Sequence, residues 1–332
     1  MHPKLLTRFV IDGPRLRAEP GPVRPPSAGE VVVQVAGVAL GVDPNAEVAG
    51  RVVAVGEAAG DWLGRRVVVP RVLPCGDCDR CRRGRAATCA ARAARAGLAS
   101  HETVPAKYLC SVEPPLWPAA LDGNPDVADS DGLWRLAALA DAAAAPYGAL
   151  MRAGIGPGEL VVVVGGGVRG AFAVAIARAK GAHPVLVDAS PARRERAAAL
   201  GARFAVDGAL APTQLREALA REAAALGLPL SGAKLLETTA TAQGRAIALA
   251  LLGDGGTAVL LDGGDQTAAP LACELFAREE TQVIGASACH PDLLPELCAL
   301  VVRGELPLTL LTTRFTAGDP LPTDDTLAIL GP

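Results

Sequence analysis

Residues 160–188 constrain the fold of this chain more than any other stretch; they read LVVVVGGGVRGAFAVAIARAKGAHPVLVD. The apolar run LVVVV is typical of a strand that is buried on both faces. It leads into the spacing Gly165-x-Gly167-x-x-Gly170, which opens an alanine-rich helical segment, and a second buried strand, PVLVD, follows. This succession of strand, glycine loop, helix and strand predicts an α/β fold with a doubly wound parallel sheet.

The glycine loop also predicts a binding site for a dinucleotide, because it directly follows a strand and opens a helix. Gly165 would allow the tight turn, Gly167 would let the backbone approach a pyrophosphate, and Gly170 would let helix and strand pack closely. The amides at the start of the helix, from Val168 onward, would hold the phosphates, and Arg169 could touch one of them. The alternative is a glycine-rich turn that binds no ligand.

The residue that ends the second strand indicates which dinucleotide is preferred. Asp188 lies eighteen residues after Gly170, where a carboxylate can accept hydrogen bonds from both ribose hydroxyls and repels a 2′-phosphate. Arg193 is close enough in sequence to line the adenosine side and to weaken that discrimination. We therefore expect NAD rather than NADP.

The remaining chain divides into segments of different character. Residues 1–150 contain short valine-rich strands bounded by Pro and Gly, which predict a compact β domain. Residues 151–285 alternate strands and helices and form the predicted nucleotide-binding domain, and residues 286–332 return to loops, one helix and a short strand. Toward the end of the first segment, residues 111–132 read as a linker. Residues 133–153, which lead into the second segment, read as two helices with a break at Pro146.

Four of the eight cysteines fall in PCGDCDRCRRGRAATC, as Cys75-x2-Cys78-x2-Cys81-x7-Cys89. Closely spaced cysteines in a cytosolic chain favour tetrahedral zinc over disulfides, and four thiolates close the coordination shell. We therefore expect one structural zinc per chain in residues 75–89, which we call the cysteine lobe. An iron–sulfur cluster and four free thiols are the alternatives. The other cysteines, Cys110, Cys273, Cys289 and Cys298, have no ligand spacing and read as small buried hydrophobes.

Composition excludes several classes of partner. Lys and Arg number 32 against 35 Asp and Glu, for a net charge of −3, so no polyanionic partner such as nucleic acid is expected. The arginine-rich stretch around the cysteines carries no aromatic residues for base stacking and reads as a solvated surface. No run is long and apolar enough for a membrane span, and the N-terminus does not resemble a secretory signal. We expect a cytoplasmic protein with no membrane partner.

The cysteine lobe followed by the glycine loop resembles the zinc-containing alcohol dehydrogenase branch of the medium-chain dehydrogenase/reductases. The segments GLASHETVPAKYL and ADAAAAPYGALMRAGIGPGE support the resemblance, and their residues are most similar to those of 6-hydroxycyclohex-1-ene-1-carbonyl-CoA dehydrogenases. The resemblance implies a GroES-like β-barrel domain, a Rossmann coenzyme domain, NAD and zinc as cofactors, and a homodimer or homotetramer built partly through the strand TQVIGAS.

The same resemblance implies a second, catalytic zinc, whose usual ligands are missing here. The family's cysteine falls at Leu40 or a neighbour, the relay hydroxyl at Val42, and the histidine of its Gly-His-Glu stretch at Ala46. Only Asp141 matches an acidic third ligand. The segment that helps to form the family's substrate pocket is almost completely missing, and the chain stops soon after TTRF, before the family's last strand.

Carboxylates and one histidine remain as candidate catalytic residues. Asp43, Glu47 and Asp141 could approach one another, but oxygen ligands alone select zinc poorly. Asp141, Glu47 or His101 could instead serve as an acid or base, although a lone histidine such as His101 is more often a satisfied surface residue. His290 lacks a supporting constellation, and Tyr147 reads more simply as packing.

Two functions follow from these residues. The first is an NAD(H)-dependent oxidoreductase that works without a catalytic zinc on a small-molecule alcohol, carbonyl or conjugated enoyl substrate; a conjugated substrate tolerates the loss of a Lewis acid best, because its charge delocalises. The second is a non-catalytic NAD-binding protein with a structural zinc. An intact coenzyme site favours the enzyme.

Overall fold

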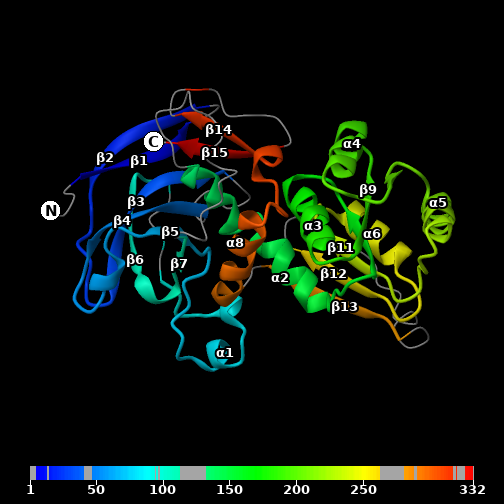
Figure 1. The fold of residues 1–332 in the computed structure, drawn as a ribbon, viewed down its shortest axis with the longest axis horizontal. Helices are drawn as coiled ribbons and strands as arrows, with labels where there is room; N and C mark the ends of the chain where they lie inside the picture. Colours follow the sequence, from blue (N-terminus) through cyan, green and yellow to red (C-terminus); the bar gives the residue numbers. More distant parts are fainter. Residues whose placement is uncertain are drawn as a thin grey trace. The chain divides into compact units, whose positions relative to one another are not determined.

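The structure is a computed structural model, and it describes residues 5–12, 15–40, 47–93, 95, 98–112, 132–261, 280–287, 290–316, 319 and 326–331. The chain forms two compact units. Unit 1 comprises Met1–Ala144 and Cys289–Pro332, and unit 2 comprises Ala145–Ala288. Unit 1 is therefore discontinuous in sequence, and the C-terminal segment returns to it (Figure 1).

Unit 1 is built on a seven-stranded sheet in the order β14-β15-β3-β4-β5-β7, with β6 also pairing with β3, and on a separate ribbon of β1 and β2. The strands are β1 (Leu5–Asp12), β2 (Arg15–Pro22), β3 (Glu30–Ala39), β4 (Glu47–Val55), β5 (Arg66–Val69), β6 (His101–Pro105), β7 (Cys110–Ser111), β14 (Thr312–Thr316) and β15 (Leu327–Gly331). Valines of β3, β4 and β5 supply eight of the eighteen buried residues of its main core cluster, as expected for β-branched residues on a pleated, buried surface.

The last of these strands, β15, corrects the expectation that residues 286–332 contain a single short strand. β15 pairs in parallel with β14 and in antiparallel register with β3, where Ile329 lies opposite Ala39. Its residues are all buried. The C-terminal segment thus completes the sheet of unit 1.

The helices of unit 1 are short. Helix α1 (Asp79–Arg82) lies in the cysteine lobe, α8 (Leu294–Val302) packs against β7, and 3₁₀ helices include Leu133–Leu139. The predicted break at Pro146 is wrong: helix α2 (Ala144–Ala153) begins two residues earlier and holds this proline in its first turn, where a missing amide hydrogen costs no hydrogen bond. The predicted linker lies mostly outside the described residues.

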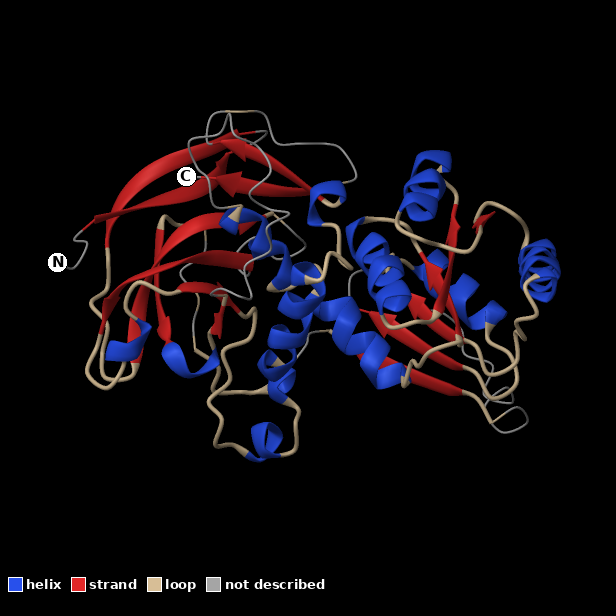
Figure 2. Ribbon diagram, in the orientation of Figure 1, coloured by secondary structure: helices blue, strands red, loops and turns tan. Residues whose placement is uncertain are grey.

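Unit 2 contains a six-stranded parallel sheet in the order β10-β9-β8-β11-β12-β13. Its strands are β8 (Leu160–Val164), β9 (His183–Asp188), β10 (Ala205–Asp207), β11 (Lys234–Glu237), β12 (Thr257–Leu261) and β13 (Gln282–Ala286), and its further helices are α3 (Val168–Ala179), α4 (Pro191–Ala199), α5 (Pro212–Ala225) and α6 (Ala242–Leu251). Figure 2 shows these helices packed around the sheet.

The strand order reverses between β8 and β11, which makes this the switch point of a doubly wound sheet. Ligands of such sheets bind in the crevice beyond the carboxyl ends of the two strands at the switch point. The predicted strand TQVIGAS corresponds to β13, which forms one edge of the sheet. No helix within the described ranges is both long and apolar enough to cross a membrane.

Candidate functional site: a thiol cluster and a dinucleotide loop

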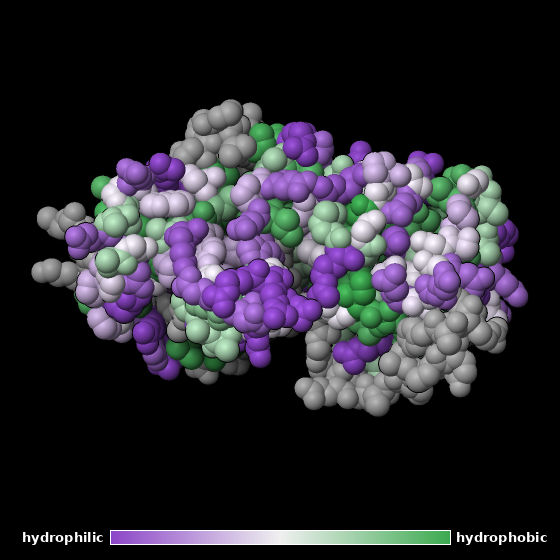
Figure 3. All heavy atoms as spheres, turned by 90° about the horizontal axis from the view of Figure 1, so that it is seen from below, coloured by the Kyte–Doolittle hydropathy of each residue, from purple (hydrophilic) through white to green (hydrophobic). Residues whose placement is uncertain are grey.

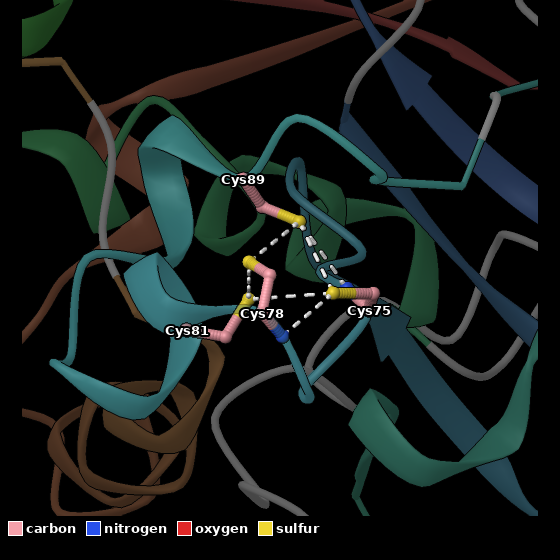
Figure 4. A group of neighbouring side chains, drawn as sticks. All are labelled: Cys75, Cys78, Cys81 and Cys89. Carbon is pink, nitrogen blue, oxygen red and sulfur yellow. Dashed lines mark hydrogen bonds between the residues drawn. The ribbon is translucent and has the colours of Figure 1, made fainter.

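The structure brings the sulfur atoms of Cys75, Cys78, Cys81 and Cys89 together, with all four within 4.8 Å of one another (Figure 4). Four of the six sulfur–sulfur separations run from 3.4 Å for Cys78–Cys81 to 3.9 Å for Cys78–Cys89. Four thiolates at about 2.3 Å from a central zinc are about 3.8 Å apart, whereas a disulfide requires about 2.05 Å. The arrangement therefore fits a tetrahedral metal and excludes disulfides among these four.

The backbone of the lobe supports this arrangement. The amides of Cys75 and Cys78 donate to the sulfurs of Cys89 and Cys75, respectively, at 3.4 Å each. Amide hydrogen bonds from Cys78 and Asp77 lower the pKa of the Cys75 thiol to about 6, whereas desolvation raises the pKa of Cys81 to about 12. A metal binding here must therefore displace protons, so its affinity rises with pH.

The surface of the lobe is strongly hydrophilic. Figure 3 views the molecule from the side on which α1 projects in Figure 1, and hydrophilic side chains gather there. Arg80 and Arg82 are exposed, and each donates to a backbone carbonyl of the lobe, that of Thr88 and that of Asp77, at 2.6 Å. These hydrogen bonds tie the two arginines to the backbone of the loop.

The candidate acids of unit 1 lie in a second, separate group. Asp141 and Glu47 are both 1% exposed. Oδ1 of Asp141 lies 3.1 Å from Nη1 of Arg71, and the amide of Ala142 donates to Oε2 of Glu47 at 3.2 Å. The amide of Arg71 also donates to the carbonyl of Ala140. Asp141 is therefore ion-paired with Arg71. Glu47 accepts from the amide of Ala142, the residue that follows Asp141.

These contacts do not fit a second metal site. Among the residues that the structure describes, the cysteine cluster is the one group of three or more metal-capable side chains that lie close enough to share an ion. Leu40, near the family's cysteine position, is described and half-buried, while Val42, Asp43 and Ala46 lie outside the described residues. The guanidinium of Arg71 supplies positive charge beside Asp141, and no local sequence pattern marks this arginine.

The two histidines weighed above have local partners. His101 begins β6, and its Nδ1 lies 3.1 Å from Oγ of Ser100. Nδ1 of His290 lies 3.3 Å from the carboxylate of Asp292 and accepts from the amide of the same residue. The catalytic roles proposed for Asp141, Glu47 and His101 remain predictions.

In unit 2, the glycine loop makes a tight turn between β8 and α3. Gly165 has φ +99°, and a Cβ there would lie 2.5 Å from Cγ2 of Thr239. A Cβ on Gly170 would overlap the carbonyl oxygen of Gly165, whereas a Cβ on Gly167 would meet no atom within 4 Å. Two glycines are thus required by packing, and the third borders open space at the N-terminus of α3. That N-terminus, which begins at Val168, has no side-chain cap, so its amides are available to an anion.

Asp188 is held at the carboxyl end of β9. Its Oδ2 accepts from the amide of Gly166 at 2.6 Å, and its Oδ1 accepts from the amide of Ser190 at 2.8 Å. Nη1 of Arg193 lies 3.6 Å from Oδ2, and Arg169 is buried within α3. Asp188 therefore links the glycine loop to the second strand, with one cation beside it. Ser190 caps α4 by accepting from the amide of Arg193.

A further contributor to this loop was not found from the sequence. The hydroxyl of Thr238, just after β11, donates to the carbonyl of Gly165 at 2.8 Å and contacts that of Val164 at 3.1 Å. The preceding Glu237 is fully buried, its Oε1 accepts from the amides of Thr239 and Ala240, and burial raises its pKa. The turn after β11 thus fixes the glycine loop from the other side of the switch point.

Two family models match this chain. Residues 27–114 match the alcohol dehydrogenase GroES-like domain, and residues 169–303 match the zinc-binding dehydrogenase domain. The first match lies within unit 1, and the second covers most of unit 2 and the start of the returning segment of unit 1. The chain therefore belongs to the zinc-containing alcohol dehydrogenase branch of the medium-chain dehydrogenase/reductases.

Individual relatives agree with this family. L-galactonate-5-dehydrogenase of Escherichia coli (strain K12) is 32% identical over 181 residues, which cover 54% of this chain and 50% of that protein. Among solved structures, an alcohol dehydrogenase from E. coli CFT073 in complex with NADH superposes with a TM-score of 0.81 at 19% identity, covering 99% of this chain and 100% of that one. A zinc-binding dehydrogenase from Sinorhizobium meliloti 1021 bound to NADP gives 0.79 at 20% identity and covers all of both chains. The structural likeness shows the fold, and the curated relative is matched over half of its length.

Proposed function

We propose that this chain is an NAD(H)-dependent oxidoreductase that transfers a hydride between the nicotinamide and an alcohol/carbonyl or conjugated enoyl substrate without a catalytic zinc. The observation that carries the proposal is the glycine loop of unit 2. The space beside Gly167 is open, the amides of α3 are uncapped, and Asp188 stands at the end of β9.

A bound NAD(H) supplies the hydride, and the protein supplies binding and orientation. Gly167 would admit the pyrophosphate to the start of α3, and Asp188 would receive the adenosine ribose. The carboxylate favours the ribose diol over a 2′-phosphate. Arg193 lies close enough to soften that preference, so NADP should bind more weakly than NAD without being rejected.

The pairing of Arg71 with Asp141 supports a reaction without a catalytic zinc. A divalent ion beside Asp141 would have to displace the Arg71 guanidinium from a carboxylate that is 1% exposed. No cysteine or histidine lies near Asp141 in the sequence to make that exchange favourable. Arg71, whose side chain is 24% exposed, would be the local cation that stabilises negative charge on a substrate oxygen.

The names of the relatives favour an alcohol/carbonyl couple as the first substrate class to test, since L-galactonate-5-dehydrogenase is among them. The structural zinc would hold the cysteine lobe and take no part in the reaction, because four thiolates leave no open coordination position.

The test is a coupled measurement of binding and turnover on protein dialysed against a mild chelator. NADH binding is followed by its fluorescence, and hydride transfer is followed by absorbance at the nicotinamide band with secondary alcohols, polyols, ketones and enones. Binding with turnover that a second chelation does not abolish supports the proposal. Binding without turnover on every class favours a non-catalytic NAD-binding protein, and failure to bind NADH contradicts both.

A further inference from the structure

Two cysteines outside the zinc lobe are brought together from distant parts of the sequence. Cys110 lies in β7 and Cys298 in α8, and their sulfur atoms are 3.6 Å apart although the residues are 188 positions apart in the chain. Both are buried, at 6% and 1% exposure. From the sequence alone, each one reads as a small buried apolar side chain.

We propose that Cys110 and Cys298 form an oxidisable pair that closes to a disulfide with peroxide as the oxidant. The sulfurs are in van der Waals contact, and they must approach by about 1.5 Å to reach the length of an S–S bond. A displacement of this size requires side-chain rotation and a small shift of α8 against β7, both of which belong to unit 1.

The contact between the two thiols indicates which one attacks the oxidant and which one resolves the intermediate. A hydrogen bond from Cys298 lowers the pKa of Cys110, and the same contact, together with burial, raises the pKa of Cys298. Cys110 is the thiolate that attacks, since the thiolate is the nucleophilic form, and it is also the more exposed of the two. Cys298 then serves as the resolving thiol.

The reaction balances in two steps. The Cys110 thiolate attacks one oxygen of hydrogen peroxide, forming a sulfenic acid and releasing hydroxide. The Cys298 sulfur then attacks the sulfenic sulfur and displaces its hydroxyl group, which leaves as water with the Cys298 proton. In sum, two thiols and one peroxide give one disulfide and two waters, and an added thiol reverses the change by exchange.

The pair joins the two separate segments of unit 1. Cys110 belongs to the segment that precedes unit 2, and Cys298 belongs to the segment that follows it. A disulfide would therefore convert the whole of unit 2 into a closed loop and fasten the returning C-terminal segment to the first. A cross-link across so long a loop restricts the unfolded chain strongly, so oxidation should stabilise unit 1.

The pair is distinct from the zinc lobe. Within the described part of the chain, metal-capable groups of three or more side chains are confined to Cys75, Cys78, Cys81 and Cys89, so no third ligand accompanies Cys110 and Cys298 among those residues. The inference does not depend on the proposed enzymatic activity.

The experiment uses the full-length, zinc-loaded protein treated with graded hydrogen peroxide. Remaining thiols are alkylated under denaturing conditions, and the protein is digested and mapped by mass spectrometry without reductant. The expected result is a peptide pair joined through Cys110 and Cys298 that disappears on reduction, with the zinc content unchanged. The matched controls Cys110→Ser and Cys298→Ser should each abolish the joined pair.

A second readout does not depend on the folding of these variants. A protease site inserted after Gly227, which is exposed and has open space around it, allows unit 2 to be cut. After oxidation, the cut protein should run as one band without reductant and as two bands with it. Recovery of Cys110 and Cys298 only as separate alkylated or over-oxidised peptides, or loss of zinc before any joined pair appears, would overturn the inference.

Discussion

Gly167→Ala separates cofactor binding from folding more cleanly than any other single change. Gly167 has φ −63° and ψ −170°, a conformation that alanine adopts, and an added Cβ would meet no atom within 4 Å. Replacing glycine with alanine at such a position stabilises a protein by about 0.4–1 kcal/mol through the unfolded chain. Gly167 is also the N-cap residue of α3. At that position alanine is less favourable than glycine by a similar free energy. The free energy of unfolding should therefore change by less than about 0.5 kcal/mol.

Cofactor affinity should respond very differently. The added methyl group would stand in the open space beside the uncapped start of α3, where it would keep a pyrophosphate off the amides. Losing one hydrogen bond to a charged group costs about 1.5–3 kcal/mol, which corresponds to an affinity for NADH lower by about 10- to 100-fold.

The assay pairs fluorescence titration with NADH and urea unfolding on the same preparations. Gly60→Ala in unit 1 is the matched control, since a Cβ there also meets nothing within 4 Å; it should leave the affinity for NADH unchanged and raise the free energy of unfolding by no more than about 1 kcal/mol. If Gly167→Ala bound NADH as tightly as the unaltered chain, at equal stability, the assignment of the phosphate site would be refuted.

Three further changes test other parts of the account. Asp188→Asn keeps an acceptor for the Gly166 amide but removes the charge, so the ratio of NADPH to NADH affinity should rise by about tenfold; an unchanged ratio would show that Asp188 does not select the cofactor. Arg71→Met leaves Asp141 buried without its ion-pair partner and should lower the free energy of unfolding by about 2–4 kcal/mol, most of which adding Asp141→Asn should restore; no restoration would speak against the pair. The ion pair with Arg24 lowers the pKa of Glu30 to about 2. Glu30→Gln should therefore cost about 1 kcal/mol at pH 7, and the difference between variant and unaltered chain should shrink as pH falls through 4.5 toward 2; a difference independent of pH would contradict this.

The sequence was most informative where backbone geometry restricts the choice of residue. The glycine loop at Gly165, Gly167 and Gly170 predicted a strand, a turn and a helix, and all three occur there. The cysteine spacing likewise predicted a cluster, because residues so close in sequence can reach a common point with only a short helix between them. In both cases the functional atoms come from one local stretch of chain.

Features that depend on long-range packing were not predictable in the same way. The strand at Leu327–Gly331 was missed because its pairing partner β3 lies almost three hundred residues earlier in the chain. The contacts of Arg71 with Asp141, of Thr238 with Gly165 and of Cys110 with Cys298 each join segments at least 70 residues apart. No local pattern marks these residues, and only the assembled sheets bring them together.

The central claim is that the metal of this chain is structural and that hydride transfer does not depend on a catalytic zinc. Its most direct test is the zinc content per chain of the purified protein after mild chelation, measured together with the variants Cys75→Ser and Asp141→Ala. We expect one tightly held zinc per chain, lost in Cys75→Ser and retained in Asp141→Ala. Two zincs per chain, the second of them lost in Asp141→Ala, would contradict it and would mean that a catalytic metal site has been rebuilt around that carboxylate.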